Sequence, residues 1–261
     1  MNEQATNVID PPDQLEPVVL TAAQMLAHRK HTGSLTSDPP ASAILCYQPS
    51  QAQYLARHYP VKKIQSFFGD VLLLKSTRSQ VAVAANFGIG APVVGVLVEE
   101  LAAWGVQRFL SVGLAGGLQT DVQPGDVVVC DGAIRDEGTS YHYLAPTRYA
   151  EASPAMVERL TRSLHSQGVA HTFGVSWTTD APYRETLRQV QAYQREGIKT
   201  VEMEAAALFV VGQCLERQVG AAFVVDDTLA DLHWRHEADR GRIQHSLERL
   251  LEAAIVCLQG W

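Results

Sequence analysis

From residue 41 onward, the apolar residues of the chain fall into short continuous runs that glycines and segments of helical period separate. Runs that are apolar at successive positions, and rich in β-branched residues, are typical of strands buried on both faces of a sheet. The pattern therefore predicts seven core strands, at residues 43–47, 71–75, 81–85, 109–113, 126–130, 172–177 and 221–225.

Start and stop signals place three helices among these strands. One begins near Pro92 and ends at Gly105, and a second begins at Ser153 and ends near Gly168. Residues 236–258 carry apolar side chains at helical spacing. Strands interleaved with helices predict an α/β protein, a single-domain three-layer sandwich with a central mixed, mostly parallel sheet.

The N-terminal part differs from the rest in its polarity and its breakers. Residues 1–17 are polar and contain three prolines, and residues 31–40 are rich in turn-forming residues. We expect residues 1–40 to form a flexible arm and loop. The length of 261 residues then suits one folded domain at residues 41–261.

The net charge and the spacing of the cysteines limit the kinds of partner that the protein can bind. A formal net charge of -7 argues against a nucleic-acid groove or an anionic membrane surface. Without an apolar h-region or an apolar stretch of membrane-spanning length, we expect a cytoplasmic protein. The four cysteines lack metal-binding spacing, so we expect buried thiols and no metal site. A small ligand is the expected partner.

Two glycine-rich segments follow predicted strands, at residues 86–92 and 113–117. Ligands of such sheets bind beyond the carboxyl ends of the strands. Val93 stands where a dinucleotide fingerprint needs its third glycine, and no lysine completes a P-loop. Either the glycines only form tight turns or they let a ligand approach the backbone.

Two carboxylates flank Met203 where a strongly apolar helix is expected to begin. Glu202 and Glu204 can interact favourably with the positive helix end. That reading explains one glutamate more easily than two, because burying an unpaired carboxylate is costly. A vicinal diol would satisfy both, since ionised carboxylates accept short hydrogen bonds from hydroxyl groups.

Asp226 and Asp227 end the last predicted core strand. Adjacent strand residues point to opposite faces, so one acid is expected to face a pocket while the other caps a turn or helix. A purely structural pair is the alternative. A carboxyl group beside an apolar strand end can have a raised pKa and can donate a proton to a departing heterocyclic base.

Taken in order, these segments resemble the nucleoside phosphorylase superfamily, in the branch that contains uridine phosphorylase and hexameric purine nucleoside phosphorylase. The resemblance spans about residues 43–255 and rests on the runs GIGAP, FLSVGLAGGLQ, VQPGDVVVCDGAIRDEGTSYHY, TTDAPYRET, VEMEAAAL and FVVDDT. It implies a nucleoside phosphorylase-like domain, assembly into homodimers or hexamers, and a pentosyltransferase that reversibly cleaves the N-glycosidic bond of a ribonucleoside.

The resemblance also implies roles for individual residues. Asp227 matches a catalytic aspartate that protonates the base in purine-specific members. Pro182 stands where the family has a base-stacking aromatic residue, which Tyr183 follows. The implied ribose-binding residues are Glu202, Met203 and Glu204, and the implied base-binding residues are Ala115, Gly116, Tyr183 and Arg184.

The expected phosphate ligands are missing. Where the family has a turn with glycine and arginine, residues 46–51 offer Tyr47 and Gln51. Ser111 and Leu114 stand where the family has a second arginine and a threonine, and the arginine that a neighbouring subunit supplies in the family would fall near Phe67 and Phe68 of this sequence. The phosphate-binding residues are therefore unknown, with Arg78, Arg135 and Arg184 as possible substitutes.

The sequence leaves three functions open: phosphorolysis, hydrolysis and nucleoside binding without catalysis. Inorganic phosphate is a possible co-substrate, and no other cofactor is expected. A nucleoside hydrolase or a non-catalytic nucleoside-binding protein is the alternative; His142 is either a general base or a packing residue. The base is open as well, because Asp227 favours a purine whereas the spacing of the segments resembles uridine phosphorylase.

Overall fold

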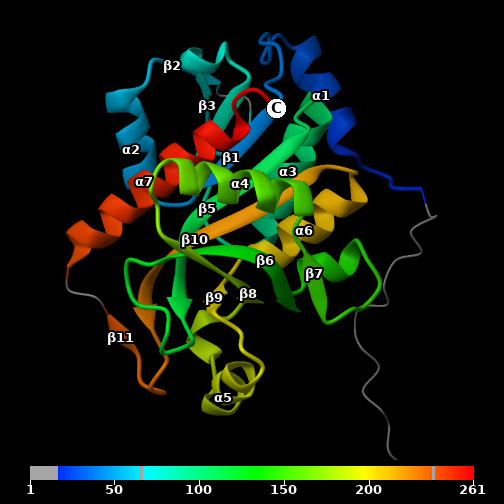
Figure 1. The fold of residues 1–261 in the computed structure, drawn as a ribbon. Helices are drawn as coiled ribbons and strands as arrows, with labels where there is room; N and C mark the ends of the chain where they lie inside the picture. Colours follow the sequence, from blue (N-terminus) through cyan, green and yellow to red (C-terminus); the bar gives the residue numbers. More distant parts are fainter. Residues whose placement is uncertain (1–16, 65–66, 237–238) are drawn as a thin grey trace, which may run out of the picture.

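A computed structural model describes residues 17–64, 67–236 and 239–261. Its strands run from β1 to β11: Ser42–Cys46, Val61–Ile64, Asp70–Leu74, Val81–Ala85, Arg108–Gly117, Val127–Asp136, Tyr149–Glu151, His171–Thr179, Thr200–Glu202, Gln218–Thr228 and Arg235–His236. Helices α1 to α7 are Ala22–His31, Pro49–His58, Ala91–Trp104, Pro154–Ser166, Leu187–Arg195, Ala205–Cys214 and Arg240–Leu258. Three short 3-10 segments are η1 (Lys75–Thr77), η2 (Thr139–His142) and η3 (Pro182–Arg184). Figure 1 shows their arrangement.

The strands form one mixed sheet that closes on itself. The order is β11-β10-β6-β8-β9-β5-β1-β4-β3-β2, β7 pairs with β6, and an additional pairing joins β10 to β5. That pairing closes β5, β10, β6, β8 and β9 into a ring, from which β1, β4, β3 and β2 extend as an open sheet. The arrangement therefore departs from an open three-layer sandwich.

The expected mixed α/β fold is confirmed, but parallel pairs do not predominate among the described residues. Five strand pairs are parallel and six are antiparallel. Continuous apolar runs indicate that a strand is buried on both faces. In a closed ring a strand is buried on both faces whether its neighbours run parallel or antiparallel to it. The sequence pattern therefore could not decide the strand directions.

The core lies on both faces of the sheet. Phe109 of β5 belongs to one buried cluster with residues of α3 and α6, whereas its neighbour Leu110 belongs to another with residues of α4 and α7. Successive side chains of a strand point to opposite faces, so β5 is covered on both. This burial holds the carboxyl end of β5 rigidly where the candidate site lies.

All seven predicted strands are present, and the three predicted helices correspond to α3, α4 and α7. The last helix begins later than predicted, because His236 lies in β11. Helix α2 and the short strands β2, β7, β9 and β11 were not predicted, and neither was α5. Their apolar signal is weak, as in β2, of whose four residues only Ile64 is buried.

The N-terminal region contains one element that the sequence did not predict. Helix α1 begins with a capping box at Thr21 and packs on α3, where Arg29 forms a bidentate ion pair with Glu100 at 2.6 Å. Only Leu26 of this helix is buried, so its periodicity is faint. The predicted arm at residues 1–16 lies outside the described residues, and the domain boundary at residue 41 stays a prediction.

The cysteines follow the prediction with one exception. Cys46, Cys130 and Cys257 are buried free thiols, but Cys214 at the end of α6 is exposed. In the part of the chain that the structure describes, no helix has the length and apolar character needed to cross a bilayer.

Candidate active site

Three strands meet at Gly116 near the carboxyl end of β5. Gly116 pairs with Val201 of β9 on one side and with Asp227 of β10 on the other. A Cβ atom at position 116 would lie 2.8 Å from Asp227 Oδ1 and 3.1 Å from Val201 Cγ1. Glycine is therefore needed here for the close approach of Asp227 and Val201, whereas Glu202, the next residue of β9, points to the opposite face, toward Thr178.

A bulge in β10 decides which of its two acids faces Gly116. Val225 lies opposite Ala115 and Asp227 lies opposite Gly116, so Asp226 is the extra residue. Asp226 accepts a hydrogen bond from Arg240 at 2.5 Å, at the start of α7. Asp227 accepts one from Trp234 Nε1 at 2.8 Å. Asp226 thus lies against the start of α7 and Asp227 lies against Gly116, and a ligand-binding role for Asp227 stays a prediction.

Glu202 holds the amino end of α6 together. Its Oε2 accepts the backbone N–H groups of Glu204 at 2.8 Å and of Ala205 at 2.7 Å, and its Oε1 accepts the Thr178 hydroxyl at 2.6 Å. Thr178 in turn accepts the N–H of Ala206 at 3.0 Å. Three N–H groups at the start of the helix thereby gain partners, which is the helix-end interaction that the sequence left open as one reading.

Glu204 is the N-cap residue of α6 and lies beside the start of α3. Its Oε1 accepts the N–H of Gly90 at 2.6 Å, and its Oε2 accepts that of Met203 at 3.3 Å. The side chain is almost fully buried. Burial, followed by the nearby charge of Glu202, raises the pKa of Glu204 to about 8. Burial raises the pKa of Glu202 as well, against the hydrogen bonds that lower it.

The acidic side of the site includes a residue that the sequence analysis did not single out. Burial raises the pKa of Asp227. Half-buried Glu185, just after η3, has a pKa raised to about 7, by burial first and by the charge of Asp227 second. Its signal in the sequence is only its place in the segment TTDAPYRET. Paired carboxyl groups with displaced pKa values are frequent at functional sites.

Tyr183 and Arg184 lie at the surface of η3. The Tyr183 side chain is 99% exposed, and Arg184 is exposed beside it. The described chain brings neither of them into contact with the acids, although Glu185 follows directly. Their assignment to the base stays a prediction. Ala115 is buried, and Met203 is half-buried between the two glutamates.

An open cavity of about 480 Å³ lies between the first turn of α3 and η2. Its lining includes Pro92, His142 and Asp180. Pro92 is two residues beyond Gly90, which binds Glu204, and Asp180 is two residues beyond Thr178, which binds Glu202. Glu202 and Glu204 are not among the lining residues, but two lining residues are each two positions from a hydrogen-bond partner of these acids, and the volume is in the range of small-molecule sites.

Comparison with known proteins identifies the family. The model of the phosphorylase superfamily matches residues 42–256. This chain belongs to the phosphorylase superfamily. The sequence-based prediction of the nucleoside phosphorylase family, and with it of an enzyme of the pentosyltransferase class, is confirmed.

Individual members of the phosphorylase superfamily resemble this chain over most of its length. A uridine phosphorylase of Treponema pallidum is 30% identical over 208 residues, which are 75% of this chain and 80% of that protein. A guanosine phosphorylase of Halorubrum lacusprofundi is 33% identical over 142 residues, 54% of this chain and 59% of that protein. The structure of a uridine phosphorylase from Vibrio fischeri superposes with a TM-score of 0.71 at 27% identity, covering 85% of this chain and 90% of that one.

Residues 46–51, which lack the expected phosphate ligands, make their polar contacts within the protein. The Tyr47 hydroxyl lies 2.9 Å from Ser111 Oγ, and its ring packs edge-on against Phe87 and directly over Gly113. Burial, and next the charge of Glu204, raise the pKa of Tyr47 well above its ordinary value. Buried Gln51 donates to the carbonyl oxygen of Val112 at 3.3 Å.

Two of the three arginines considered as phosphate ligands are placed elsewhere. Arg135 is buried and donates to Ser140, Thr147 and the carbonyl oxygens of residues 144 and 145, with its guanidinium over the Tyr141 ring. Its role is therefore structural, and the acceptors named here are uncharged. Arg78 lies in the turn before β4, at the amino end of that strand. Arg184 stays a candidate.

Proposed function

We propose that this protein cleaves the N-glycosidic bond of a ribonucleoside and transfers the pentosyl group to inorganic phosphate, in the manner of a uridine phosphorylase. The proposal rests on two observations: the buried carboxyl groups of Glu202 and Glu204 at the amino end of α6, and the carboxyl group of Asp227 beside Gly116 at the carboxyl end of β5. A sugar with vicinal hydroxyls and a proton-accepting leaving group matches these three carboxyl groups.

Glu204 is the principal ribose ligand in this proposal. An ionised carboxylate offers about four acceptor positions. Glu202 already accepts three hydrogen bonds from the protein, whereas Glu204 accepts two. Glu204 therefore retains capacity for two hydroxyl groups, whereas Glu202 is engaged in holding the start of α6 and also interacts with Ser176. Met203 lies between them against the sugar.

Asp227 assists the leaving base. Because burial raises its pKa, the carboxyl group keeps a proton to a higher pH than an exposed aspartate does. A protonated carboxyl group next to the base can donate as the glycosidic bond breaks, which lowers the barrier to departure. Ala115 and Gly116 present backbone to the base, while Tyr183 and Arg184 are the candidates to cover it once the segment at η3 closes.

The reaction is tested by measuring base release from uridine and from inosine, each with and without inorganic phosphate. We expect free base together with a pentose 1-phosphate, and only when phosphate is present, because the enzyme is a pentosyltransferase. Chromatography of the products resolves both. Base release that is equally fast without phosphate contradicts transfer to phosphate, and thermal stabilisation by a nucleoside without any release contradicts catalysis.

Self-association belongs to the same proposal. Assembly as a homodimer or a hexamer is an expectation from the sequence resemblance, and light scattering of the purified protein measures it directly.

A further inference from the structure

Trp234 combines exposure with a specific polar contact. Its side chain is 65% exposed, yet its indole Nε1 donates to Asp227 Oδ2 at 2.8 Å. Its ring stacks on His236 with the centroids 5.7 Å apart and the planes 20° from parallel. Buried indole groups usually carry such a hydrogen bond, but a mostly exposed one has water available instead. The contact with Asp227 therefore indicates a role in the site.

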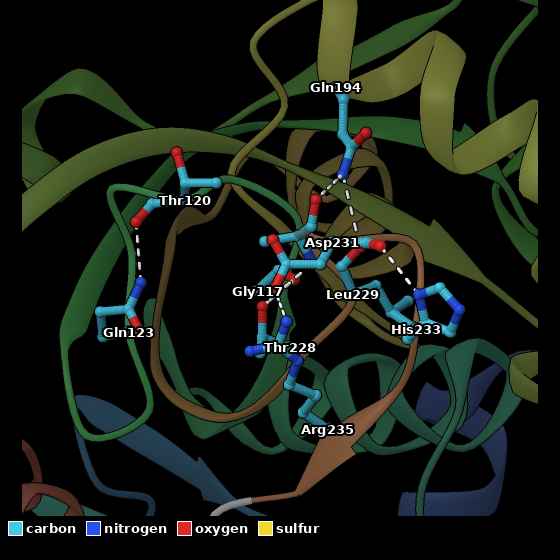
Figure 2. Close-up of polar contacts among 10 residues, drawn as sticks. Gly117, Thr120, Gln123, Gln194, Thr228, Leu229, Asp231, His233 and Arg235 are labelled. Carbon is cyan, nitrogen blue, oxygen red and sulfur yellow. Dashed lines mark hydrogen bonds and ion pairs between the residues drawn. The ribbon is translucent and has the colours of Figure 1, made fainter.

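The segment that carries Trp234 is anchored at both ends. After it, β11 pairs with β10 through Asp227 and His236 and through Thr228 and Arg235. Before it, Gln194 Nε2 donates to the carbonyl oxygens of Leu118, Leu229 and Ala230, and the Thr228 hydroxyl donates to the carbonyl oxygen of Gly117. Figure 2 shows this anchoring around Gly117, Thr228 and Leu229. The indole thus lies on a segment that these hydrogen bonds place beside Asp227.

The two oxygen atoms of Asp227 have different surroundings. Oδ2 receives the indole N–H, while Oδ1 points to the place above Gly116 where a Cβ atom would collide with it. A carboxyl group can rotate about its terminal bond, which is a soft torsion. We propose that Trp234 is a positioning residue that, through its indole N–H, keeps Asp227 Oδ1 turned toward the leaving base. This inference rests on the proposed function for the identity of the base.

The groups around Asp227 determine in which direction its pKa changes when Trp234 is replaced. Asp226 raises its pKa, while His236 and Arg240 lower it, and Glu185 faces it from the segment after η3. The hydrogen bond from Trp234 lowers the pKa, because an N–H donor stabilises the ionised carboxylate. Removing the donor therefore raises the pKa of Asp227, and the protonated form persists to higher pH.

Steady-state kinetics of base release from uridine or inosine with phosphate test the proposal. Trp234→Phe keeps an aromatic ring but loses the donor; we expect kcat/KM at neutral pH to fall by roughly tenfold, as for loss of a hydrogen bond to a charged group. The alkaline limb of its pH profile should move to higher pH. Trp234→Gln restores an N–H donor and should return the limb toward the wild-type position.

A matched tryptophan serves as the control. Trp261 lies far from the site at the end of the chain, where Arg108 and Arg159 cover its ring. Trp261→Phe should leave kcat/KM and the pH profile unchanged. A Trp234→Phe enzyme with the wild-type profile would overturn the proposal.

A measurement without turnover separates this inference from the proposed function. In protein labelled with ¹⁵N-tryptophan, the indole resonance that Trp234→Phe removes identifies Trp234 among the four tryptophans. We expect its pH titration to lose the Asp227 step in Asp227→Asn and to keep it in His236→Gln. A step that survives Asp227→Asn overturns the role of Trp234. A wild-type protein that releases no base overturns the proposed function alone.

Discussion

Glu204 sits where two opposing effects act on one carboxyl group. Burial and the neighbouring Glu202 favour its protonated form, whereas the N–H groups of Gly90 and Met203 favour the ionised form. The first pair of effects is larger, so the group stays protonated up to a pKa of about 8. A ligand whose hydroxyls bind the ionised carboxylate would lower that value, so ribose binding is expected to release a proton near neutral pH.

Glu204→Gln tests both the role and the titration of this residue. The amide oxygen can still accept the N–H of Gly90, but the charge that binds hydroxyls is lost; we expect kcat/KM for base release to fall by roughly tenfold to a hundredfold. An exposed acid, Glu151 of β7, provides the control as Glu151→Gln. Turnover of Glu204→Gln at the wild-type rate would contradict the assignment.

The same variant changes how stability depends on pH. The native pKa of about 8 lies above the ordinary value of 4.5, so between these values the folded protein keeps a proton that the unfolded chain has lost. The free energy of unfolding therefore decreases as the pH rises through this interval. Glu204→Gln should flatten that decrease, which urea unfolding at about pH 5 and about pH 8 measures.

The candidate acids of the site could be singled out from the sequence, but the residues that bond to them could not. Glu202, Glu204 and Asp227 stand out because acids are unusual in apolar segments. Thr178 and Trp234 look ordinary until the strands are placed, and the glycine-rich turn that contains Gly90 gives no sign that it binds Glu204, because those two residues are distant in sequence. Whether the acids bind ribose and base stays a prediction.

At the scale of elements, the site depends on how closely β5, β9 and β10 approach one another. The contact is possible because Gly116 carries no side chain. Gly132 of β6 is the matched case, since a Cβ atom there would meet its nearest atoms at 3.5 and 3.7 Å, which is ordinary packing.

Gly116→Ala should therefore impair the site, whereas Gly132→Ala should not. The added methyl would meet Asp227 Oδ1 at 2.8 Å and Val201 at 3.1 Å, so we expect overpacking to cost about 1–3 kcal/mol of unfolding free energy and to lower kcat/KM for base release. Thermal unfolding and kinetics of both variants decide this. Equal losses in the two variants would show that any strand glycine is sensitive.

The local sequence pattern predicts the long strands and helices but not which residues pair between strands. The apolar runs of β5 and β10 are evident in the sequence, and so is the apolar α6 after Glu204. Strand β9 has only three residues, Thr200–Glu202, which is too short for alternation to be recognised. Its pairing with Gly116 depends on the ring, a property of contacts between segments about 85 residues apart.

Across the whole molecule, stability is concentrated where the ring joins the open sheet. Strand β5 pairs with β1, β9 and β10, and its residues 109–113 are all buried. By contrast, β2 and β11 end the sheet. The fold class is therefore easier to predict than the topology. Alternating strands and helices indicate an α/β protein. Closure of the ring depends on the pairing of β5 with β10, which no local sequence pattern indicates.

Amide hydrogen exchange should follow this distribution. We expect the slowest exchange in β5 and in the central part of β10, because opening them requires global unfolding, and fast exchange in β2 and β11. Mass spectrometry of peptic peptides gives the comparison at one pH. Protection of β11 equal to that of β5 would contradict it and would mean that the hairpin is stabilised from outside the described contacts.

The bulge at Asp226 makes the chemistry depend on chain length as well as on residue type. With the rest of β10 held in register, one residue inserted upstream would place Asp226 opposite Gly116, and one residue deleted upstream would place Thr228 there. Conservative point substitutions in β10 can be absorbed by packing, whereas a single-codon insertion or deletion upstream would replace the acid that lies opposite Gly116. Loss of activity by a frame-preserving indel is thus a short mutational route from enzyme to inactive homologue.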